Sequence, residues 1–325
     1  MLLDPAIARA ISDASTDPPE CTPHGGSGFS KTYKLTIPSS SDGPSTNYFL
    51  KLAPGSEAST MFAGEHASLS AIHSAVPALA PTSIAHGECE NEPGTFFLLT
   101  EFVDFSASGR VAGDSLAKKL AKLHTTPAPA PEGRERPAFG FEVTTCCGDT
   151  PQDNEFCDSW AEFYGERRLK AILKRGQSRN GNDKELAKLI DDVVDKVVPR
   201  LLGDGHLGGE EGIVPVVVHG DLWSGNHGKG KVGGREDVEE VVFDPSSCYA
   251  HSEFELGIMR MFGGFGGGFL KEYHELCPKT EPKEEYEDRV DLYELYHHLN
   301  HWSIFGGGYR SGAMRLMKGL LKKYG

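Results

Sequence analysis

Two short apolar strands near the middle of the chain, each followed directly by polar residues, constrain the fold more than any other feature. The first is a β-branched run at residues 216–218, followed by a carboxylate at Asp221 and a carboxamide at Asn226. The second comes after a Gly-rich, charged hairpin and ends at another carboxylate, Asp244. In phosphoryl-transfer sites, one Asp orients and deprotonates the attacking hydroxyl, whereas an Asn and a second Asp hold the metal that bridges the nucleotide phosphates. We therefore predict Asp221 as the catalytic base, and Asn226 and Asp244 as Mg²⁺ ligands.

Ordinary loop chemistry is the alternative explanation, because Asp and Asn are common after strands, where their side chains form Asx turns. A lone H-G-D tripeptide would carry little information. Here the five-residue spacing from Asp221 to Asn226, the two flanking strands and the terminal Asp244 occur together and in order. This combination favours the catalytic interpretation.

Length and composition narrow the possibilities. A chain of 325 residues, 38% hydrophobic and 9% aromatic, is long enough for two lobes that each have a core. The net charge of −14 argues against nucleic acid or an anionic membrane as a partner. Seven cysteines without a C-x-x-C pair favour reduced thiols. No apolar run approaches the ~20 residues that cross a bilayer, and no secretion signal is evident, so we expect a cytoplasmic protein.

The first hundred residues have the pattern of a small β-rich lobe. Asp4 is suited to cap a helix over residues 4–14, with Pro5 in its first turn. A Gly-rich turn and the alternating runs around it predict three antiparallel strands, and a helix and a further buried strand follow. The segments are the turn at residues 24–30, the runs at 33–37 and 48–52, the helix at 57–74 and the buried strand at 95–103.

Most of the remaining chain has helical periodicity, with the catalytic hairpin in its middle. Helices are predicted at residues 112–124, 154–174, 183–202, 253–261, 284–302 and 311–324, with a Gly-rich break at 263–268. This order predicts an α+β, bilobal fold. A small antiparallel β-sheet N-lobe with one helix would span residues 1–103, and a mainly helical C-lobe would span residues 104–325. A cleft between two lobes is a usual place for a small-molecule site.

The glycines of the first turn are suited to a phosphate loop, because backbone N–H groups there can approach phosphates without interference from a Cβ atom. A Gly-rich hairpin turn is the commoner origin of such a pattern, and the G-x-x-x-x-G-K-[ST] signature of a P-loop NTPase is absent from the sequence. Together with the catalytic segment, the turn predicts nucleotide contacts from Gly25, Gly26, Ser27, Gly28, Phe29 and Ser30.

A lysine, a glutamate and a connector complete the predicted nucleotide site. Lys51, held by Glu65 on the following helix, would place an ammonium group on the nucleotide phosphates. Glu57 is the competing carboxylate, but it lies close to the helix start, where it more simply complements the helix dipole. Backbone groups of the connector would bind an adenine edge, unless this segment is a plain buried strand end. Its residues are Glu101, Phe102 and Val103.

Several motifs are more distinctive than this general pattern. They are M-F-A-G-E-H-A-S-L at residues 61–69, F-G-F-E-V-T-T-C-C-G-D-T-P-Q-D-N-E-F at 139–156, H-G-D-L-W-S-G-N at 219–226, F-D-P-S-S-C-Y-A-H-S-E-F-E-L at 243–256, M-F-G-G-F at 261–265 and Y-H-H-L-N-H-W at 296–302. In these motifs, and over nearly the whole chain, the sequence resembles the fructosamine/ketosamine-3-kinase family.

The resemblance implies a protein-kinase-like fold of the aminoglycoside and choline kinase type. It implies that ATP phosphorylates the 3-hydroxyl of a sugar that is attached as a ketoamine to a protein lysine. The 3-phosphate then makes the adduct prone to eliminate, which frees the amine. Expected substrates are glycated proteins or ketoamine small molecules, and the expected cofactors are ATP and Mg²⁺. Because ribulosamine activity looks the more widespread in the family, we expect ribulosamines to be better substrates than fructosamines.

At matching positions, the resemblance implies the same residue roles as those predicted above. It also implies three aromatic groups that could contact the face of a sugar ring, although packing in the core is the alternative role for these groups. These groups are Trp223, His301 and Trp302. Many family members carry a cysteine where this chain has Gly28, so thiol-dependent control at that position is not implied. One of His251, Glu253 and Glu255 is expected to anchor the catalytic loop, with helix capping as the alternative for the glutamates.

Two differences from protein kinases indicate a site that is not switched by loop phosphorylation. Gly220 stands where a protein kinase has the Arg of H-R-D, so no guanidinium is present to receive an activation-loop phosphate. Pro245, which restricts the backbone, follows Asp244 in place of Phe-Gly.

Two other functions use the same residues. A small-molecule kinase of the aminoglycoside or choline type shares the Asp, Asn and Asp set, and only the H-S-E-F-E and N-H-W motifs disfavour it. A catalytically inactive, nucleotide-binding scaffold belongs to a different class of protein. It is disfavoured because every expected catalytic residue is present.

Overall fold

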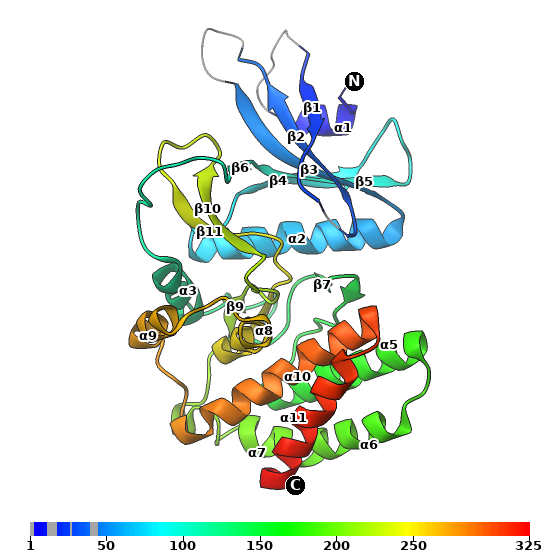
Figure 1. The fold of residues 1–325 in the computed structure, drawn as a ribbon, viewed down its shortest axis with the longest axis vertical. Helices are drawn as coiled ribbons and strands as arrows, with labels where there is room; N and C mark the ends of the chain where they lie inside the picture. Colours follow the sequence, from blue (N-terminus) through cyan, green and yellow to red (C-terminus); the bar gives the residue numbers. More distant parts are fainter. Residues whose placement is uncertain (1–2, 12–17, 27, 40–44) are drawn as a thin grey trace.

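The fold is known from a computed structural model, which describes residues 3–11, 18–26, 28–39 and 45–325. Within these ranges, the upper lobe in Figure 1 is built on a five-stranded antiparallel sheet with the strand order β1-β2-β3-β5-β4. The strands are β1 (Glu20–Pro23), β2 (Lys31–Ile37), β3 (Thr46–Pro54), β4 (Ser83–Glu88) and β5 (Thr95–Glu101).

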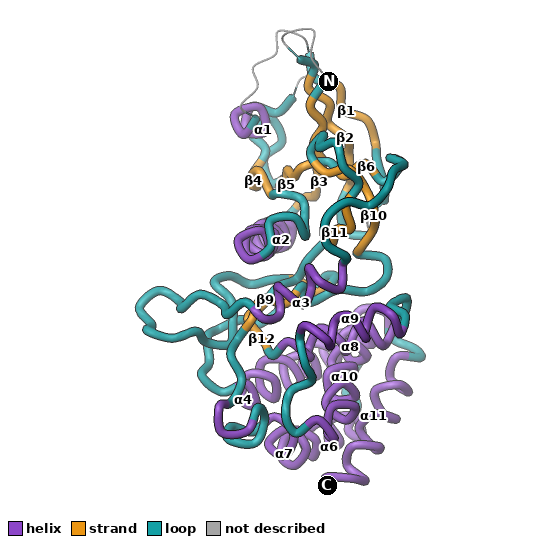
Figure 2. Tube along the Cα trace, turned by 90° about the vertical axis from the view of Figure 1, so that its left-hand side faces the viewer, coloured by secondary structure: helices purple, strands orange, loops and turns teal. Residues whose placement is uncertain are grey.

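Two helices cover opposite faces of this sheet, because alternate residues of a strand point to opposite sides. Phe97 and Leu99 of β5 pack with Ile7 of α1 (Pro5–Ala10), whereas Leu98 packs with Phe62 of α2 (Ser56–Ala75). Figure 2 shows α1 above and α2 below the central strands. The Asp4 side chain accepts a hydrogen bond from the Ala6 amide, which confirms its predicted role as N-cap of α1.

A second group of strands lies between the sheet and the helical lobe and carries the catalytic segment. The strands β10 (His227–Val232) and β11 (Glu239–Val242) form a hairpin. The other edge of β10 pairs with β6 (Val103–Asp104). Two shorter pairs join β9 (Val216–Val218) to β12 (Cys248–Ala250), and β7 (Cys146–Cys147) to β8 (Thr150–Pro151). The predicted boundary between residues 103 and 104 falls inside β6, and the division into domains at that point stays a prediction.

The lower lobe is mainly helical. Its helices are α3 (Leu116–Thr125), α4 (Trp160–Tyr164), α5 (Ala171–Asn180), α6 (Lys184–Asp192), α7 (Val198–Leu202), α8 (Glu255–Phe262), α9 (Gly267–Leu276), α10 (Tyr286–Phe305) and α11 (Tyr309–Tyr324). Two π-helical turns continue α4 and α6, at Gly165–Lys170 and Val193–Val197, and short 3-10 turns occupy Gly209–Glu211, Ser252–Phe254 and Lys283–Glu285.

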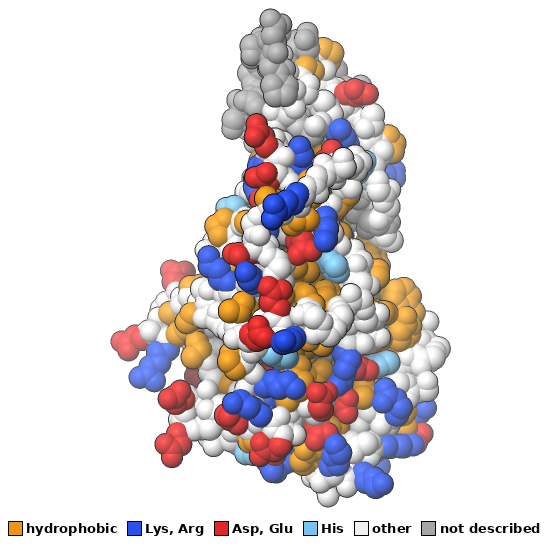
Figure 3. Space-filling model, turned by 60° about the vertical axis from the view of Figure 1, so that its left-hand side comes forward, with side chains coloured by type: hydrophobic (Ala, Val, Ile, Leu, Met, Phe, Trp, Pro, Cys, Tyr) orange, Lys and Arg blue, Asp and Glu red, His pale blue; other side chains and the backbone are white. Residues whose placement is uncertain are grey.

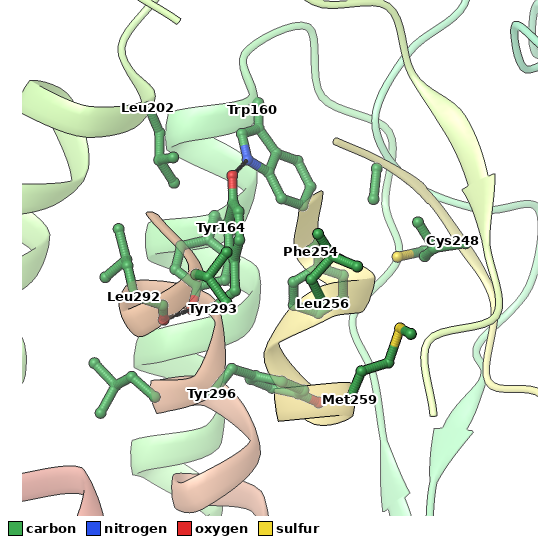
Figure 4. Close-up of a cluster of buried hydrophobic side chains, with 14 of the residues drawn as sticks. Trp160, Tyr164, Leu202, Cys248, Phe254, Leu256, Met259, Leu292, Tyr293 and Tyr296 are labelled. Atoms are coloured by element: carbon green, nitrogen blue, oxygen red, sulfur yellow. Dashed lines mark hydrogen bonds between the residues drawn. The ribbon is translucent and has the colours of Figure 1, made fainter. Parts of the chain in front are cut away.

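An aromatic cluster forms the centre of the helical lobe (Figure 4). The indole of Trp160 donates a hydrogen bond to the Tyr293 hydroxyl at 2.9 Å, and the Tyr164 hydroxyl donates to the Leu292 carbonyl. Phe254, just before α8, packs edge-on against both tyrosine rings. The start of α8, which follows the catalytic segment, is thereby fixed to α4 and α10.

Some elements lie where the sequence did not predict them. The strand β4 was not predicted, and α9 begins at Gly267, inside the predicted Gly-rich break. Glycine weakens a helix by only about 1 kcal/mol, and packing of α9 against α3 offsets this cost. Conversely, the helix expected at residues 112–124 begins only at Leu116, because Ser115 caps it by accepting a hydrogen bond from the Lys118 amide.

Acidic and basic side chains are interspersed on the face that Figure 3 shows, without a large patch of one sign. In the described part of the chain, no helix is both long and apolar enough to cross a membrane.

Candidate active site

A buried lysine joins three elements at the centre of the molecule. Lys51 on β3 is only 7% exposed, and its Nζ lies 2.7 Å from Oε1 of Glu65 on α2 and 2.7 Å from Oδ1 of Asp244 after β11. Burial alone would lower the pKa of Lys51, but the two carboxylates together raise it above its ordinary value. The group therefore stays a cation at neutral pH and lies where β3, α2 and the segment after β11 meet.

The predicted base, Asp221, is held by hydrogen bonds to both of its carboxylate oxygens. Asn226 Nδ2 donates to Oδ2 at 3.3 Å and to the Asp221 carbonyl at 2.9 Å, and the Cys147 thiol donates to Oδ1 at 3.8 Å. Burial and the nearby carboxylates of Asp244 and Glu255 raise the pKa of Asp221 to about 8. A strongly basic carboxylate suits proton abstraction, and positive charge brought into the cleft would keep it ionised at neutral pH.

The thiol on Asp221 is itself held from the far side. Asn300 on α10 donates from Nδ2 to the Sγ of Cys147 at 3.2 Å and to its carbonyl at 3.2 Å. Cys147 and Asn300 are each 1% exposed. Sequence reasoning did not assign a role to either residue, although both stand in the distinctive motifs at residues 139–156 and 296–302. The only signal was their presence there, since residues 147 and 221 are far apart in sequence.

Glu255 anchors the catalytic loop. Its carboxylate is 1% exposed and accepts hydrogen bonds from the His219 and Gly220 amides, the latter at 3.0 Å. Glu253 instead forms an ion pair with Arg289 at 2.7 Å. The anchor among the three candidates is therefore Glu255. Its two backbone contacts fix the turn directly before Asp221, which is a common way to orient a functional group.

Gly220 is required by the space available to it. Its φ is +82°, and a Cβ atom there would lie 2.1 Å from the carbonyl oxygen of Ser246. An arginine, as in H-R-D, would meet the same obstacle in this backbone. The absence of that arginine, which the sequence shows, therefore has a steric reason in addition to its regulatory meaning.

The donor set opposite Asp221 suits a hard divalent cation. Asn226 lines the cleft, and because its Nδ2 donates to Asp221, its carboxamide oxygen is left as an acceptor; Asp244 supplies a carboxylate that is about half exposed. Within the described residues, Asp244 is the one non-glycine with positive φ, at 57°, and such strain gathers at functional positions. In the part of the chain that the structure describes, no cluster of three or more His, Cys, Asp or Glu side chains could hold a metal ion. Two oxygen ligands fit Mg²⁺, which is bound by few protein groups, better than Zn²⁺.

Two adjoining hollows run from this centre to the connector. The first has a volume of about 470 Å³ and is lined by Lys51, Glu65, Asp221 and Asp244, together with the glycine loop and Trp223. The second has a volume of about 210 Å³ and is lined by the connector and by aromatic rings. They share Gly26, Glu65, Phe243 and Asp244.

Most of the predicted nucleotide residues line these hollows. Gly26, Gly28, Phe29 and Ser30 line the first, and Gly25, Glu101, Phe102 and Val103 line the second. Ser27 lies outside the described residues. The Glu101 carboxylate contacts Arg235 and the Thr82 amide, and the Phe102 carbonyl accepts a hydrogen bond from the Gly233 amide. Hydrogen bonds and an ion pair thus join the connector to the residue before β4 and to the β10–β11 connection.

The three aromatic candidates for a sugar face do not lie together. Trp223 is 39% exposed at the cleft, and its ring lies 5.7 Å from Phe262, which in turn lies 5.0 Å from His301. Trp302 is 5% exposed and packs against Gly176, where a Cβ atom would lie 2.2 Å from the indole. The structure therefore places Trp302 in the core, and it places Phe262, which we did not predict, between the other two.

This arrangement has the parts that phosphoryl transfer needs. A buried cation, two side chains whose oxygen atoms suit a metal, and a buried carboxylate converge on one cleft beneath a glycine loop. The fold and the site together define a kinase of the protein-kinase-like class. Aminoglycoside phosphotransferase APH(4)-Ia has the same fold, with a TM-score of 0.55 and 12% identity over 98% of this chain and 96% of that one. The predicted fold class is thus confirmed.

The chain belongs to the fructosamine kinase family, whose model matches residues 5–323. It is 36% identical over 290 residues to ketosamine-3-kinase of Mus musculus, covering 84% of this chain and 88% of the mouse protein. It is also 36% identical to a chloroplastic protein-ribulosamine 3-kinase of Arabidopsis thaliana, over 81% of this chain and 72% of the plant protein. A solved structure assigned as a fructosamine-3-kinase of Thermobifida fusca superposes with a TM-score of 0.75, at 24% identity over 98% of this chain and 99% of that one.

Proposed function

We propose that this protein uses ATP to phosphorylate the sugar 3-hydroxyl of protein-bound ribulosamine or fructosamine, and so initiates protein deglycation. The observation that carries the proposal is Asp221, a carboxylate held at both oxygens beside two metal-type ligands and a buried lysine. The 36% identity to a mouse protein named ketosamine-3-kinase, over most of both chains, supports the choice of acceptor.

The residues of the cleft would share the reaction as follows. Asp221 orients the 3-hydroxyl and takes its proton as the bond from O3 to the γ-phosphorus forms. The bond from the γ-phosphorus to the bridging oxygen breaks, and ADP leaves with the electron pair. Lys51, kept in place by Glu65, would stabilise the negative charge of the phosphates.

ATP and Mg²⁺ are the cofactors that the site fits. A thermostable variant of APH(4)-Ia, which has a similar fold, was solved with AMP-PNP and hygromycin B, and this supports ATP as the donor. Asn226 and Asp244 would hold Mg²⁺, which when bound neutralises charge on the phosphates. The glycine loop and the connector hollow would take the rest of the nucleotide.

Phosphorus NMR on ribulosyl-lysine tests the proposal. With ATP and Mg²⁺, we expect a new phosphomonoester whose phosphorus couples to the proton on sugar carbon 3, followed by slow release of inorganic phosphate and free lysine. A phosphomonoester on another carbon, or none, would contradict the proposal. ATP without acceptor serves as the control for simple hydrolysis.

The alternative is a small-molecule kinase of the aminoglycoside or choline type, which the shared fold supports. The same assay distinguishes the two, with hygromycin B and choline as acceptors in place of the ketoamine. If either gave the higher kcat/KM, the alternative would hold.

A further inference from the structure

A row of aromatic side chains leads away from the catalytic loop across the surface of the helical lobe. We call it the aromatic strip, and it consists of Trp223, Phe262, His301, Phe305 and Tyr309. Successive ring centroids from Trp223 through Phe262 and His301 to Phe305 are separated by 5.7, 5.0 and 5.8 Å. Tyr309 completes the row, 5.1 Å from His301 and 6.2 Å from Phe305.

The strip exposes large aromatic side chains to solvent. Trp223, Phe262 and Phe305 are 39%, 38% and 64% exposed, and Phe305 exceeds every other large hydrophobic residue in the described part of the chain. Single exposed apolar residues are ordinary, but contiguous ones rimmed by polar groups mark binding surfaces. A contiguous row that begins at the candidate active site is therefore typical of a binding surface.

The strip is continuous with the catalytic cleft and is rigid. Trp223 lines the same hollow as Asp221 and stands two residues after it, on the loop that Glu255 anchors. Phe262 ends α8, Phe305 ends α10, and Tyr309 begins α11. Because these three residues belong to helices that pack in the lobe, little backbone entropy is lost when a ligand covers their rings.

We propose that the aromatic strip binds the polypeptide segment around the glycated lysine of a protein substrate. The inference rests on the proposed function. If the 3-hydroxyl lies at Asp221, the sugar continues through its amine and the lysine methylenes to a main chain, which must leave the cleft. In the proposed function, the connector hollow at the other end holds the nucleotide. The strip is a contiguous apolar path that starts beside Asp221.

The chemistry of such a segment matches the strip. Lysine methylenes and neighbouring apolar side chains cover aromatic rings well, and the protonated secondary amine of a ketoamine is attracted to ring faces. The three ring-to-ring steps are long enough to follow several residues of an extended chain, at about 3.3 Å per residue. The net charge of −14 attracts lysine-rich segments to the protein as a whole at long range.

The proposal separates two kinds of strip residue. Trp223 lines the cleft and should matter for any ketoamine, whereas Phe305 lies at the far end and should matter only when a polypeptide is attached. Substrates that carry the same sugar on different amines therefore test the strip without changing the chemistry.

The experiment compares kcat/KM for ribulosyl-methylamine and for a lysine-rich peptide that carries one ribulosyl-lysine. For Phe305→Ala we expect an unchanged value with the methylamine adduct, and a loss of about five- to thirtyfold with the peptide, as for an aromatic anchor in an interface. The control variant is Leu276→Ala, since Leu276 is 50% exposed at the end of α9 and lies outside the strip. It should change neither value.

Each other outcome has a definite meaning. Equal effects of Phe305→Ala on both substrates, no effect on either, or the same selective loss in Leu276→Ala would overturn the proposal. A wild-type dimer that Phe305→Ala converts to a monomer, with both kcat/KM values unchanged, would make the strip a self-association surface instead. If the wild-type protein phosphorylated neither substrate, the proposed function itself would fail.

Discussion

The thiol of Cys147 lies 3.8 Å from Oδ1 of Asp221 and donates its hydrogen to that oxygen. Asn300 donates to the same sulfur at 3.2 Å, so the Asp221 carboxylate is connected through one buried thiol to α10. On its other oxygen Asp221 meets Asn226, a predicted metal ligand. Asp221, the proposed base, is thus held between Asn226 and the core of the helical lobe.

This contact predicts a kinetic difference between two substitutions of Cys147. Cys147→Ala removes the hydrogen bond and should lower kcat by roughly three- to tenfold, with little change in the KM for ATP. Cys147→Ser keeps a donor and should recover most of kcat. If the serine and alanine variants lost the same activity, the thiol would only fill space. Far-UV circular dichroism and the Tm of both variants control for folding.

Removing the base should stop turnover without preventing nucleotide binding. We expect Asp221→Asn to reduce kcat by about 10²–10⁴-fold, which is the usual contribution of general-base catalysis. ATP affinity, measured by calorimetry, should stay nearly unchanged because Asp221 contacts Asn226 and Cys147 but not Lys51. A variant that kept more than about a tenth of wild-type kcat would exclude this role.

Asp244→Ala should abolish Mg²⁺-dependent nucleotide binding, because it removes the charge that compensates the metal and one of few protein ligands. The measurement is ATP affinity with and without Mg²⁺. Asp237→Ala is a matched control, since Asp237 is an exposed aspartate in the β10–β11 connection. A Mg²⁺ dependence in Asp244→Ala equal to that of the control would contradict the assignment.

The stability of the fold should fall in mild acid, because His251 is buried with both ring nitrogens 2.8 Å from hydroxyls, those of Tyr293 and Thr280. Burial lowers the pKa of His251 from 6.5 to about 4. Between these values the unfolded chain binds more protons than the folded one, so the free energy of unfolding decreases as the pH falls from 6.5 toward 4. At pH 4.5 this site should account for a loss of roughly 2–3 kcal/mol.

Urea unfolding at pH 7.5 and 4.5 measures this loss. In His251→Gln, which keeps hydrogen-bonding groups but does not titrate, the decrease between the two pH values should be smaller by about that amount. An equal decrease in both proteins would show that other groups cause the acid sensitivity.

We predict that ribulosamines are better substrates than fructosamines. A fructosamine carries one more hydroxymethine, which must find space and hydrogen-bond partners beside Trp223. Misfit of one such group is typically worth ~1–3 kcal/mol, or about 10–200-fold in kcat/KM. The comparison uses ribulosyl-lysine and fructosyl-lysine. An equal or higher value for fructosyl-lysine would refute the preference and leave the kinase assignment intact.

Several site residues could be predicted because they stand close together in the sequence. Asp221, Asn226 and Asp244 follow the strands of one local segment, and their spacing is visible without the fold. Lys51 was predicted from its position on a strand before the helix with Glu65, although its contact with Asp244 spans 193 residues. The structure supplied the reason why these groups meet, since β3, α2 and the β10–β11 hairpin converge on one point.

The burial of Trp302 could not be predicted from the sequence pattern. The helix α10 is buried on most of its circumference, so its sequence lacks the apolar stripe that would separate core from surface positions. His301 and Trp302 therefore looked equivalent, yet one ring lies in the aromatic strip and the other packs on Gly176.

The sequence by itself determined the class of chemistry, the family and the order of the lobes, because strand ends, spacings and motifs are local properties of a chain. Only the tertiary structure decided which distant groups touch. It brought Cys147 to Asp221, assigned the anchor to Glu255 and aligned the rings of the aromatic strip. Such contacts depend on how helices and strands pack, and no short stretch of sequence encodes the packing of two elements that lie far apart along the chain.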